Sequence, residues 1–216
     1  MKLKWFGWAS WLIEVDRKKI YIDPFKGESS EKADIVLVSH NHPDHCDVRR
    51  LKGIVGENTI VLTPSIFAKD IDAESLDIGQ SREIDGIKIT GVAAYNLNIP
   101  NHQKGVDTGF LIEAEGKKVY FAADTDLIED MNMLNGIDIA LLPIGGTYTM
   151  DIDAAVKAVE IIKPKIVIPM HYGVIDAFFG EKPMHIELKA DPDEFKEKVG
   201  ELAEVKILKE GEETEV

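Results

Sequence analysis

Residues 40–45 read His-Asn-His-Pro-Asp-His, which places four side chains that can bind a metal within six positions. The segment follows the apolar run Ile35–Ser39, so it begins where a predicted β-strand ends. Alternation along the strand puts the first two histidines on one side, and Pro43 then turns the chain away from regular pairing. Imidazole and carboxylate groups are ligands that zinc, iron and manganese prefer. The candidate ligands here are His40, His42, Asp44 and His45.

Three more ligand-type side chains follow predicted strands later in the chain. They are His102 in the loop after Ile87–Tyr95, Asp124 after Val119–Ala122, and His171 after Lys165–Ile168. Because catalytic groups gather where strand ends share one edge of an open α/β sheet, we expect these side chains to join the first four. The alternative is a polar surface turn that happens to be rich in histidine, and it leaves the later side chains unexplained.

Together, the HxHxDH motif, the loop histidine, the strand-terminal aspartate before threonine and the last histidine resemble the metallo-β-lactamase superfamily. The resemblance runs from the predicted hairpin ending at residues 21–24 to residues 170–173. Residues 142–150 are similar to the compact branch of small metal-dependent hydrolases that includes relatives of L-ascorbate-6-phosphate lactonase. Two sequence departures accompany this resemblance. Ala123 replaces the glycine usual before the aspartate, and Trp8 replaces the histidine of a Gly-His-Ala-Ser segment.

The ligand count and the resemblance imply two divalent metal ions, zinc or manganese with iron as the alternative, and no organic cofactor. One ion would take His40, His42 and His102, the other Asp44, His45 and His171, and Asp124 would bridge them. Two metal ions about 3.5–4 Å apart can lower the pKa of a shared water towards roughly 7, giving a hydroxide that attacks the substrate. Asp44 is also the expected catalytic carboxylate. The sequence has no GxSxG, P-loop or HExxH motif that would indicate another mechanism.

Other residues near these positions have two interpretations each. Asp23 either holds the HxHxDH loop by hydrogen bonds or forms an ordinary turn before Pro24. Tyr148 and Thr149 either face the substrate or belong to a glycine turn that begins a helix.

The remaining candidates are favoured as structural. His185 is expected in a solvent-facing loop, with a lid that meets substrate as the alternative. Asn96 and Asn98 are expected in turns rather than against substrate. Cys46 is expected to be a small half-buried residue that opens a helix rather than a ligand or reactive thiol.

The pattern of apolar residues predicts an α/β protein with an αββα four-layer sandwich, because hairpin-like strands precede alternating strands and helices. Helices are expected at Asp47–Gly53, Asp126–Leu134, Asp153–Ile162 and Asp193–Val199, and the Glu-rich run Glu210–Glu215 is expected to be a solvated tail. The strands expected besides those above are Lys2–Phe6, Trp11–Val15, Lys19–Ile22, Ile35–Val38, Thr59–Leu62, Phe110–Glu113, Ile139–Leu142 and Val205–Leu208.

Length and composition limit the function further. The 216 residues suit one domain spanning 1–216, without a linker or repeat. With 25 basic and 39 acidic residues the net charge is −14, which argues against a nucleic-acid partner. A single cysteine and the lack of a membrane-length apolar run favour a cytoplasmic protein with no membrane partner. The expected partner is a small-molecule substrate, and a homo-oligomer is left open.

Three functions remain in play. The favoured one is hydrolysis of a small ester-like substrate, namely a lactone, phosphodiester or thioester. The alternatives are an iron-dependent redox protein acting on oxygen or sulfur species, and a non-catalytic metal-binding module. Iron content with an optical band would favour the redox protein, whereas the intact set of seven ligands argues against the non-catalytic module.

Overall fold

A computed structural model describes residues 1–27, 31–179 and 182–216. Contacts divide the chain into two compact units. The first unit comprises Met1–Asp77, Ile175–Ile186 and Leu208–Val216, and the second comprises Ile78–Val174 and Glu187–Ile207. The single domain expected for residues 1–216 stays a prediction.

The first unit is built on a mixed sheet of seven strands in the order β16-β1-β2-β3-β4-β5-β6. The strands are β1 (Lys2–Gly7), β2 (Ser10–Val15), β3 (Lys18–Ile22), β4 (Ile35–Leu37), β5 (Ile60–Thr63), β6 (Glu74–Ser75) and β16 (Glu213–Glu215). Neighbours from β16 to β3 pair antiparallel, and those from β3 to β6 pair parallel. The carboxyl ends of β3 and β4 therefore lie at one edge of the sheet.

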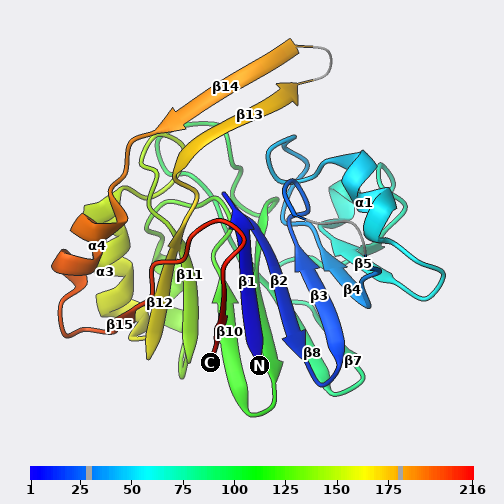
Figure 1. The fold of residues 1–216 in the computed structure, drawn as a ribbon, viewed down its shortest axis with the longest axis horizontal. Helices are drawn as coiled ribbons and strands as arrows, with labels where there is room; N and C mark the ends of the chain where they lie inside the picture. Colours follow the sequence, from blue (N-terminus) through cyan, green and yellow to red (C-terminus); the bar gives the residue numbers. More distant parts are fainter. Residues whose placement is uncertain (28–30, 180–181) are drawn as a thin grey trace. The chain divides into compact units, whose positions relative to one another are not determined.

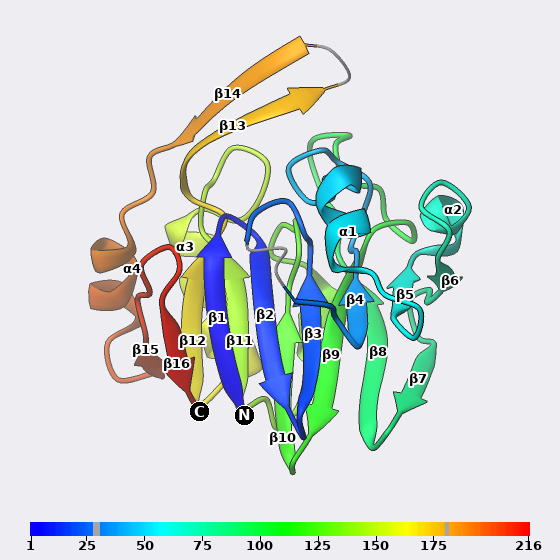
Figure 2. The same ribbon diagram turned by 45° about the vertical axis from the view of Figure 1, so that its right-hand side comes forward.

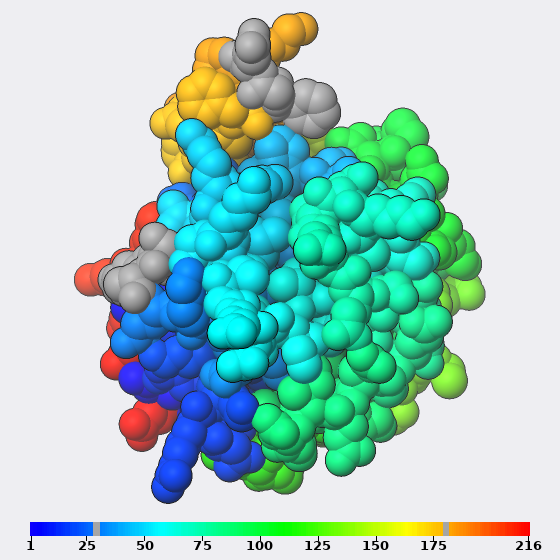
Figure 3. Space-filling model, turned by 90° about the vertical axis from the view of Figure 1, so that its right-hand side faces the viewer, coloured from blue at the N-terminus to red at the C-terminus, as the bar shows by residue number. Residues whose placement is uncertain are grey.

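Two helices belong to the first unit, α1 (Val48–Ile54) and α2 (Ser65–Ala68). The Asp47 side chain begins α1 by accepting hydrogen bonds from the backbone of its first turn. Leu51 and Ile54 pack into a core cluster with apolar side chains of β1 to β5. Val48, Arg49 and Lys52 are exposed, and the light blue and cyan atoms in Figure 3 belong to the stretch of chain that contains α1. Because α1 follows the 40–45 segment directly, its packing anchors one end of that segment.

The second unit contains another mixed sheet of seven strands, in the order β15-β12-β11-β10-β9-β8-β7. The strands are β7 (Ser81–Ile84), β8 (Ile87–Ala93), β9 (Thr108–Ala114), β10 (Lys117–Phe121), β11 (Ile139–Pro143), β12 (Ile166–Met170) and β15 (Glu204–Val205). Pairing is antiparallel from β7 to β10 and parallel from β10 to β15. The parallel strands β10, β11 and β12 bring three strand ends to one edge.

Helices α3 (Ile152–Ile162) and α4 (Pro192–Val199) pack beside β11 and β12 of this sheet (Figure 1). The predicted apolar face of α3 is observed, since Ala155, Ala158, Val159 and Ile162 are buried and Ala154 is half-buried. The expected helix Asp126–Leu134 is wrong in extent: only a 3₁₀ helix, η1 (Glu129–Met133), forms. The Asp126 carboxylate accepts hydrogen bonds from the segment after β8, so it does not cap a helix there.

Two further expectations are corrected. The segment around His185 is strand β14 (Lys182–Leu188), paired with β13 (Gly173–Phe179), rather than a loop. The Glu-rich C-terminal run supplies β16, which pairs with β1 at the edge of the sheet (Figure 2), because backbone pairing and the Lys2–Glu213 ion pair hold it there. Within the described residues, no helix is both long enough and apolar enough to span a membrane.

Candidate metal centre

The ligand-type segment of the first unit follows β4, as predicted. His40 and His45 are buried, whereas His42 and Asp44 are partly exposed. The His40 ring lies 4.0 Å from the His45 ring and 4.6 Å from the His42 ring, centroid to centroid. His45 Nε2 lies 3.9 Å from Asp44 Oδ2. The first unit thus brings its four candidate ligands together.

Asp23, directly after β3, holds the segment 39–45 through hydrogen bonds. Its carboxylate accepts hydrogen bonds from Ser39 N (2.8 Å), Ser39 Oγ (2.6 Å) and His45 Nδ1 (2.7 Å). Complete burial raises the pKa of the Asp23 carboxyl, and the hydrogen bonds from His45 and Ser39 oppose that rise. The predicted hydrogen-bonding role of Asp23 is therefore confirmed.

The same hydrogen bonds define the ring nitrogens of two histidines. The Asp23 carboxylate accepts from Ser39 N and Ser39 Oγ, and where it also accepts from His45, Nδ1 of that ring carries the proton. Ser39 Oγ gives its one hydrogen to Asp23, so it must accept from His40 Nδ1 at 2.9 Å. In both rings Nε2 is then the nitrogen with the lone pair, which is the form that binds a metal.

Trp8 makes a contact that the sequence interpretation missed. Its indole Nε1 donates to Asp44 Oδ2 at 3.1 Å, although Trp8 stands where the resemblance led us to expect a histidine. Ser10, two residues later, donates through Oγ to the Asp23 carbonyl at 2.6 Å. The hairpin of β1 and β2 therefore holds the Asp44 carboxylate and the backbone carbonyl of Asp23. The segment 7–10, Gly-Trp-Ala-Ser, was the available signal for a role of Trp8, but the sequence did not indicate that Asp44 is its partner.

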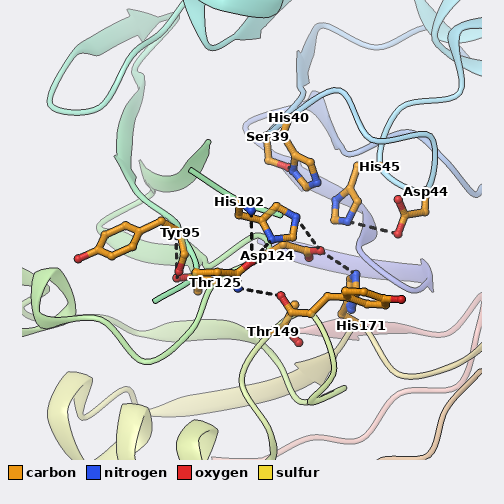
Figure 4. Close-up of polar contacts among 12 residues, drawn as sticks. Ser39, His40, Asp44, His45, Tyr95, His102, Asp124, Thr125, Thr149 and His171 are labelled. Atoms are coloured by element: carbon orange, nitrogen blue, oxygen red, sulfur yellow. Dashed lines mark hydrogen bonds and ion pairs between the residues drawn. The ribbon is translucent and has the colours of Figure 1, made fainter. Parts of the chain in front are cut away.

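The second unit collects its three candidate ligands from separate segments. Asp124 Oδ2 lies 3.1 Å from His171 Nε2 and 3.5 Å from His102 Nε2, and Figure 4 shows both rings turned towards this carboxylate. All three side chains are buried. Ala123, after β10, and His171, after β12, both have a left-handed backbone, with φ of 55° and 56°. The usual glycine before the aspartate is thus explained by backbone conformation.

Gly145 holds the loop after β11 against His171. A side chain at Gly145 would collide with the carbonyl oxygen of His171, so only glycine permits this approach. In the same loop, Thr149 is buried and its hydroxyl contacts the carbonyl of Met150, whereas Tyr148 is partly exposed. Asp151 then caps α3, which agrees with the glycine turn and helix start expected here.

The remaining candidates lie as follows. His185 is exposed and pairs with Asp176 across the β13–β14 hairpin (2.9 Å), which fits the solvent-facing interpretation. Cys46 is buried, and burial, followed by the charges of Asp23 and Asp47, raises its pKa to about 12. The thiol therefore stays protonated at neutral pH. Asn96 contacts His102, with 2.7 Å between Oδ1 and Nδ1, a partner that the sequence did not indicate.

The donor chemistry fits divalent metal ions. The side chains offer imidazole nitrogens and carboxylate oxygens, and in each unit a hydrogen bond from Nδ1 directs Nε2 of a histidine towards a carboxylate. Burying imidazole and carboxylate groups together costs free energy unless a cation is bound, because both kinds of group lose their hydration. Zinc, manganese and iron all accept these ligands.

Comparison with known proteins agrees with this chemistry. The family described as beta-lactamase superfamily domain matches residues 2–171. A UPF0173 metal-dependent hydrolase of Pyrococcus abyssi is 36% identical over 236 aligned positions that cover all of both chains. Another, of Thermococcus kodakarensis, is 38% identical over 236 positions with the same coverage.

A solved structure gives the same result for the fold. A metallo hydrolase of the hyperthermophilic archaeon Ignicoccus hospitalis superposes with a TM-score of 0.81 at 31% identity, covering 99% of this chain and 97% of that one. The expected metallo-β-lactamase fold is confirmed, while the likeness to L-ascorbate-6-phosphate lactonase stays a prediction. This chain belongs to the metallo-β-lactamase superfamily, among its metal-dependent hydrolases.

Proposed function

We propose that the protein hydrolyses a small ester-like substrate, a lactone, phosphodiester or thioester, with two divalent metal ions. The observation that carries this proposal is the Asp124 carboxylate with a histidine Nε2 at 3.1 Å and another at 3.5 Å. A carboxylate between two imidazoles suits a ligand that two ions share. The single domain expected for residues 1–216 is part of this proposal.

The ligand assignment is the one that the ligand count and the resemblance to the superfamily imply. We assign His40, His42 and His102 to one ion, Asp44, His45 and His171 to the other, and Asp124 to both. When bound, zinc or manganese would supply activation of water at neutral pH and stabilisation of the negative charge that develops on the substrate. Iron remains the alternative metal.

The protein's own residues orient this chemistry. Asp23 holds the His45 ring and Ser39 holds the His40 ring, and in both rings Nε2 is the nitrogen whose lone pair can bind a metal. Trp8 fixes Asp44, the carboxylate that we propose as catalytic. Cys46 stays protonated because burial raises its pKa to about 12, so the nearby thiol does not compete as a nucleophile.

The test is a set of chromogenic phosphodiester, lactone and thioester substrates, assayed with the zinc, manganese and iron forms. Metal analysis should give two ions per chain. Asp44→Ala should abolish turnover while the circular dichroism spectrum is retained, and His185→Ala, which changes an exposed residue outside the ligand set, should turn over normally. Full activity of Asp44→Ala, or one ion per chain in excess metal, would contradict the proposal.

A further inference from the structure

Asn96 lies after β8 and is 9% exposed. Its side-chain oxygen accepts from two groups of one residue, His102 N at 3.2 Å and His102 Nδ1 at 2.7 Å. Its amide nitrogen donates to Asp126 Oδ1 at 3.1 Å and to the Tyr148 carbonyl at 2.9 Å. The amide therefore uses both hydrogens and both oxygen lone pairs.

These contacts determine which way the amide faces. Asp126 and the Tyr148 carbonyl offer only oxygen atoms without hydrogens, so they must face the NH₂ group. A flipped amide would point its oxygen at two other oxygens. The Asp126 carboxylate is itself held by Leu97 N at 2.7 Å, so it cannot turn away. Asp126 thus locks the amide with its oxygen towards His102.

The locked amide also determines the protonation of the ring. Asn96 Oδ1 has no hydrogen to give, so His102 Nδ1 must carry the proton between them. The lone pair then resides on Nε2, which is the atom 3.5 Å from Asp124 Oδ2. In the opposite tautomer the lone pair of His102 Nδ1 would face Asn96 Oδ1, so two acceptors would meet, and Nε2–H would point towards the Asp124 carboxylate.

We propose that Asn96 is the positioning residue for His102. It fixes the Nδ1–H tautomer and the ring plane, and Asp126 acts through it. This inference rests on the proposed function only in taking His102 as a metal ligand. A side-chain amide serves here, whereas the Asp23 carboxyl group serves His45, so the two histidines are oriented by different chemistry.

The experiment compares the full-length protein with three variants. Asn96→Leu removes the amide at similar volume. Asp126→Asn leaves this residue with one acceptor oxygen, where Asn96 and Leu97 now use two. Asn98→Leu makes the same chemical change as Asn96→Leu at an exposed position of the same segment. Two quantities are measured, the zinc dissociation constant by competition with a chromogenic chelator and the His102 ring signals by long-range ¹H–¹⁵N correlation. Thermal unfolding reports folding in parallel.

We expect Asn96→Leu to weaken zinc binding roughly 10–100-fold, the range typical for loss of a hydrogen-bond partner of a metal-bound histidine. The His102 Nδ1–H signal should be present in the unsubstituted protein and lost or broadened in Asn96→Leu. Asp126→Asn should show a smaller change in the same direction, and Asn98→Leu should match the unsubstituted protein. If Asn96→Leu does not fold, Asp126→Asn and the ring signal of the unsubstituted protein decide the question.

Two outcomes are distinguishable. A His102 ring protonated on Nε2 but not on Nδ1 in the unsubstituted protein, or unchanged zinc affinity and ring signals in folded Asn96→Leu, would overturn the role of Asn96. A protein that shows the Nδ1–H tautomer but binds no zinc, manganese or iron would instead contradict the proposed function, since the tautomer is set by hydrogen bonds within the chain.

Discussion

The two units pair their strands in the same sense, antiparallel neighbours followed by parallel ones, yet they assemble their ligand-type side chains differently. In the first unit all four ligand-type side chains come from residues 40–45 after β4, and one buried carboxylate, Asp23, holds this segment by hydrogen bonds. The second takes one from each of three separate segments, and an amide, Asn96, orients one of them.

The difference shows two ways of positioning ligands. A contiguous segment needs few anchors, because the chain itself sets the spacing, and a single carboxylate can hold it through Ser39 and His45. Dispersed ligands depend on strand order, since β10 and β12 each deliver one and the loop after β8 delivers the third. We therefore expect a single substitution in the second unit to disturb one ligand-type side chain at a time, whereas loss of Asp23 should disturb several of those in the first unit together.

Apart from the Asp44→Ala test given above, the largest effect should come from Asp124→Ala. This removes the carboxylate between two histidines, so kcat/KM should fall by roughly 10³-fold, which is about 4 kcal/mol of transition-state stabilisation. Metal analysis of the purified variant should show fewer than two ions per chain. An Asp124→Ala variant with normal turnover and two ions would remove Asp124 from the ligand set.

Asp23→Ala should come next and should act on stability as well as binding. Three donors from Ser39 and His45 lose a buried acceptor, so the free energy of unfolding should fall by about 3 kcal/mol. For a chain of this size that corresponds to a Tm lower by roughly 6–12 °C. Asp34→Ala, directly before β4 and partly exposed, is the control and should cost less than about 1 kcal/mol. Equal effects of the two changes would show that Asp23 is not an anchor.

The helix caps test whether the units are otherwise alike. Asp47 begins α1 and Asp151 begins α3, each accepting a 2.8 Å hydrogen bond from the first turn. Replacing either by alanine should cost about 1 kcal/mol in unfolding free energy. Because α1 follows the ligand segment, only Asp47→Ala should also weaken metal binding. Chelator competition on both variants checks this, and an equal loss of affinity in Asp151→Ala would contradict it.

The smallest effect should be that of Ala123→Gly. Glycine relieves a left-handed residue at φ 55°, but it loses a buried methyl group and adds freedom to the unfolded chain. These opposing terms are each about 1 kcal/mol, so thermal unfolding should show a net change within about 0.5 kcal/mol. A large loss of stability would mean that the Ala123 methyl group, not its backbone, holds Asp124 in place.

Particular elements show why prediction succeeded unevenly. α3 was predicted closely because its apolar residues recur at helical spacing and Asp151 caps it. The Asp126–Leu134 helix was wrong in extent because Asp126 bonds to Leu97 and Asn96, which are distant in sequence. β14 and β16 were missed because their residues alternate weakly, and pairing with β13 and β1 makes them strands.

The sequence by itself determined the candidate ligand types, the segment 40–45 and the superfamily, since residue chemistry, short spacing and the order of motifs are local properties. It also placed Asp23 at a strand end, where a hydrogen-bonding role could be predicted. Only the tertiary structure decided which donors meet: Trp8 with Asp44, Asn96 with His102, and both Asp124 contacts with histidine. These contacts join residues up to 47 positions apart, and they depend on strand order and register, which no local periodicity specifies.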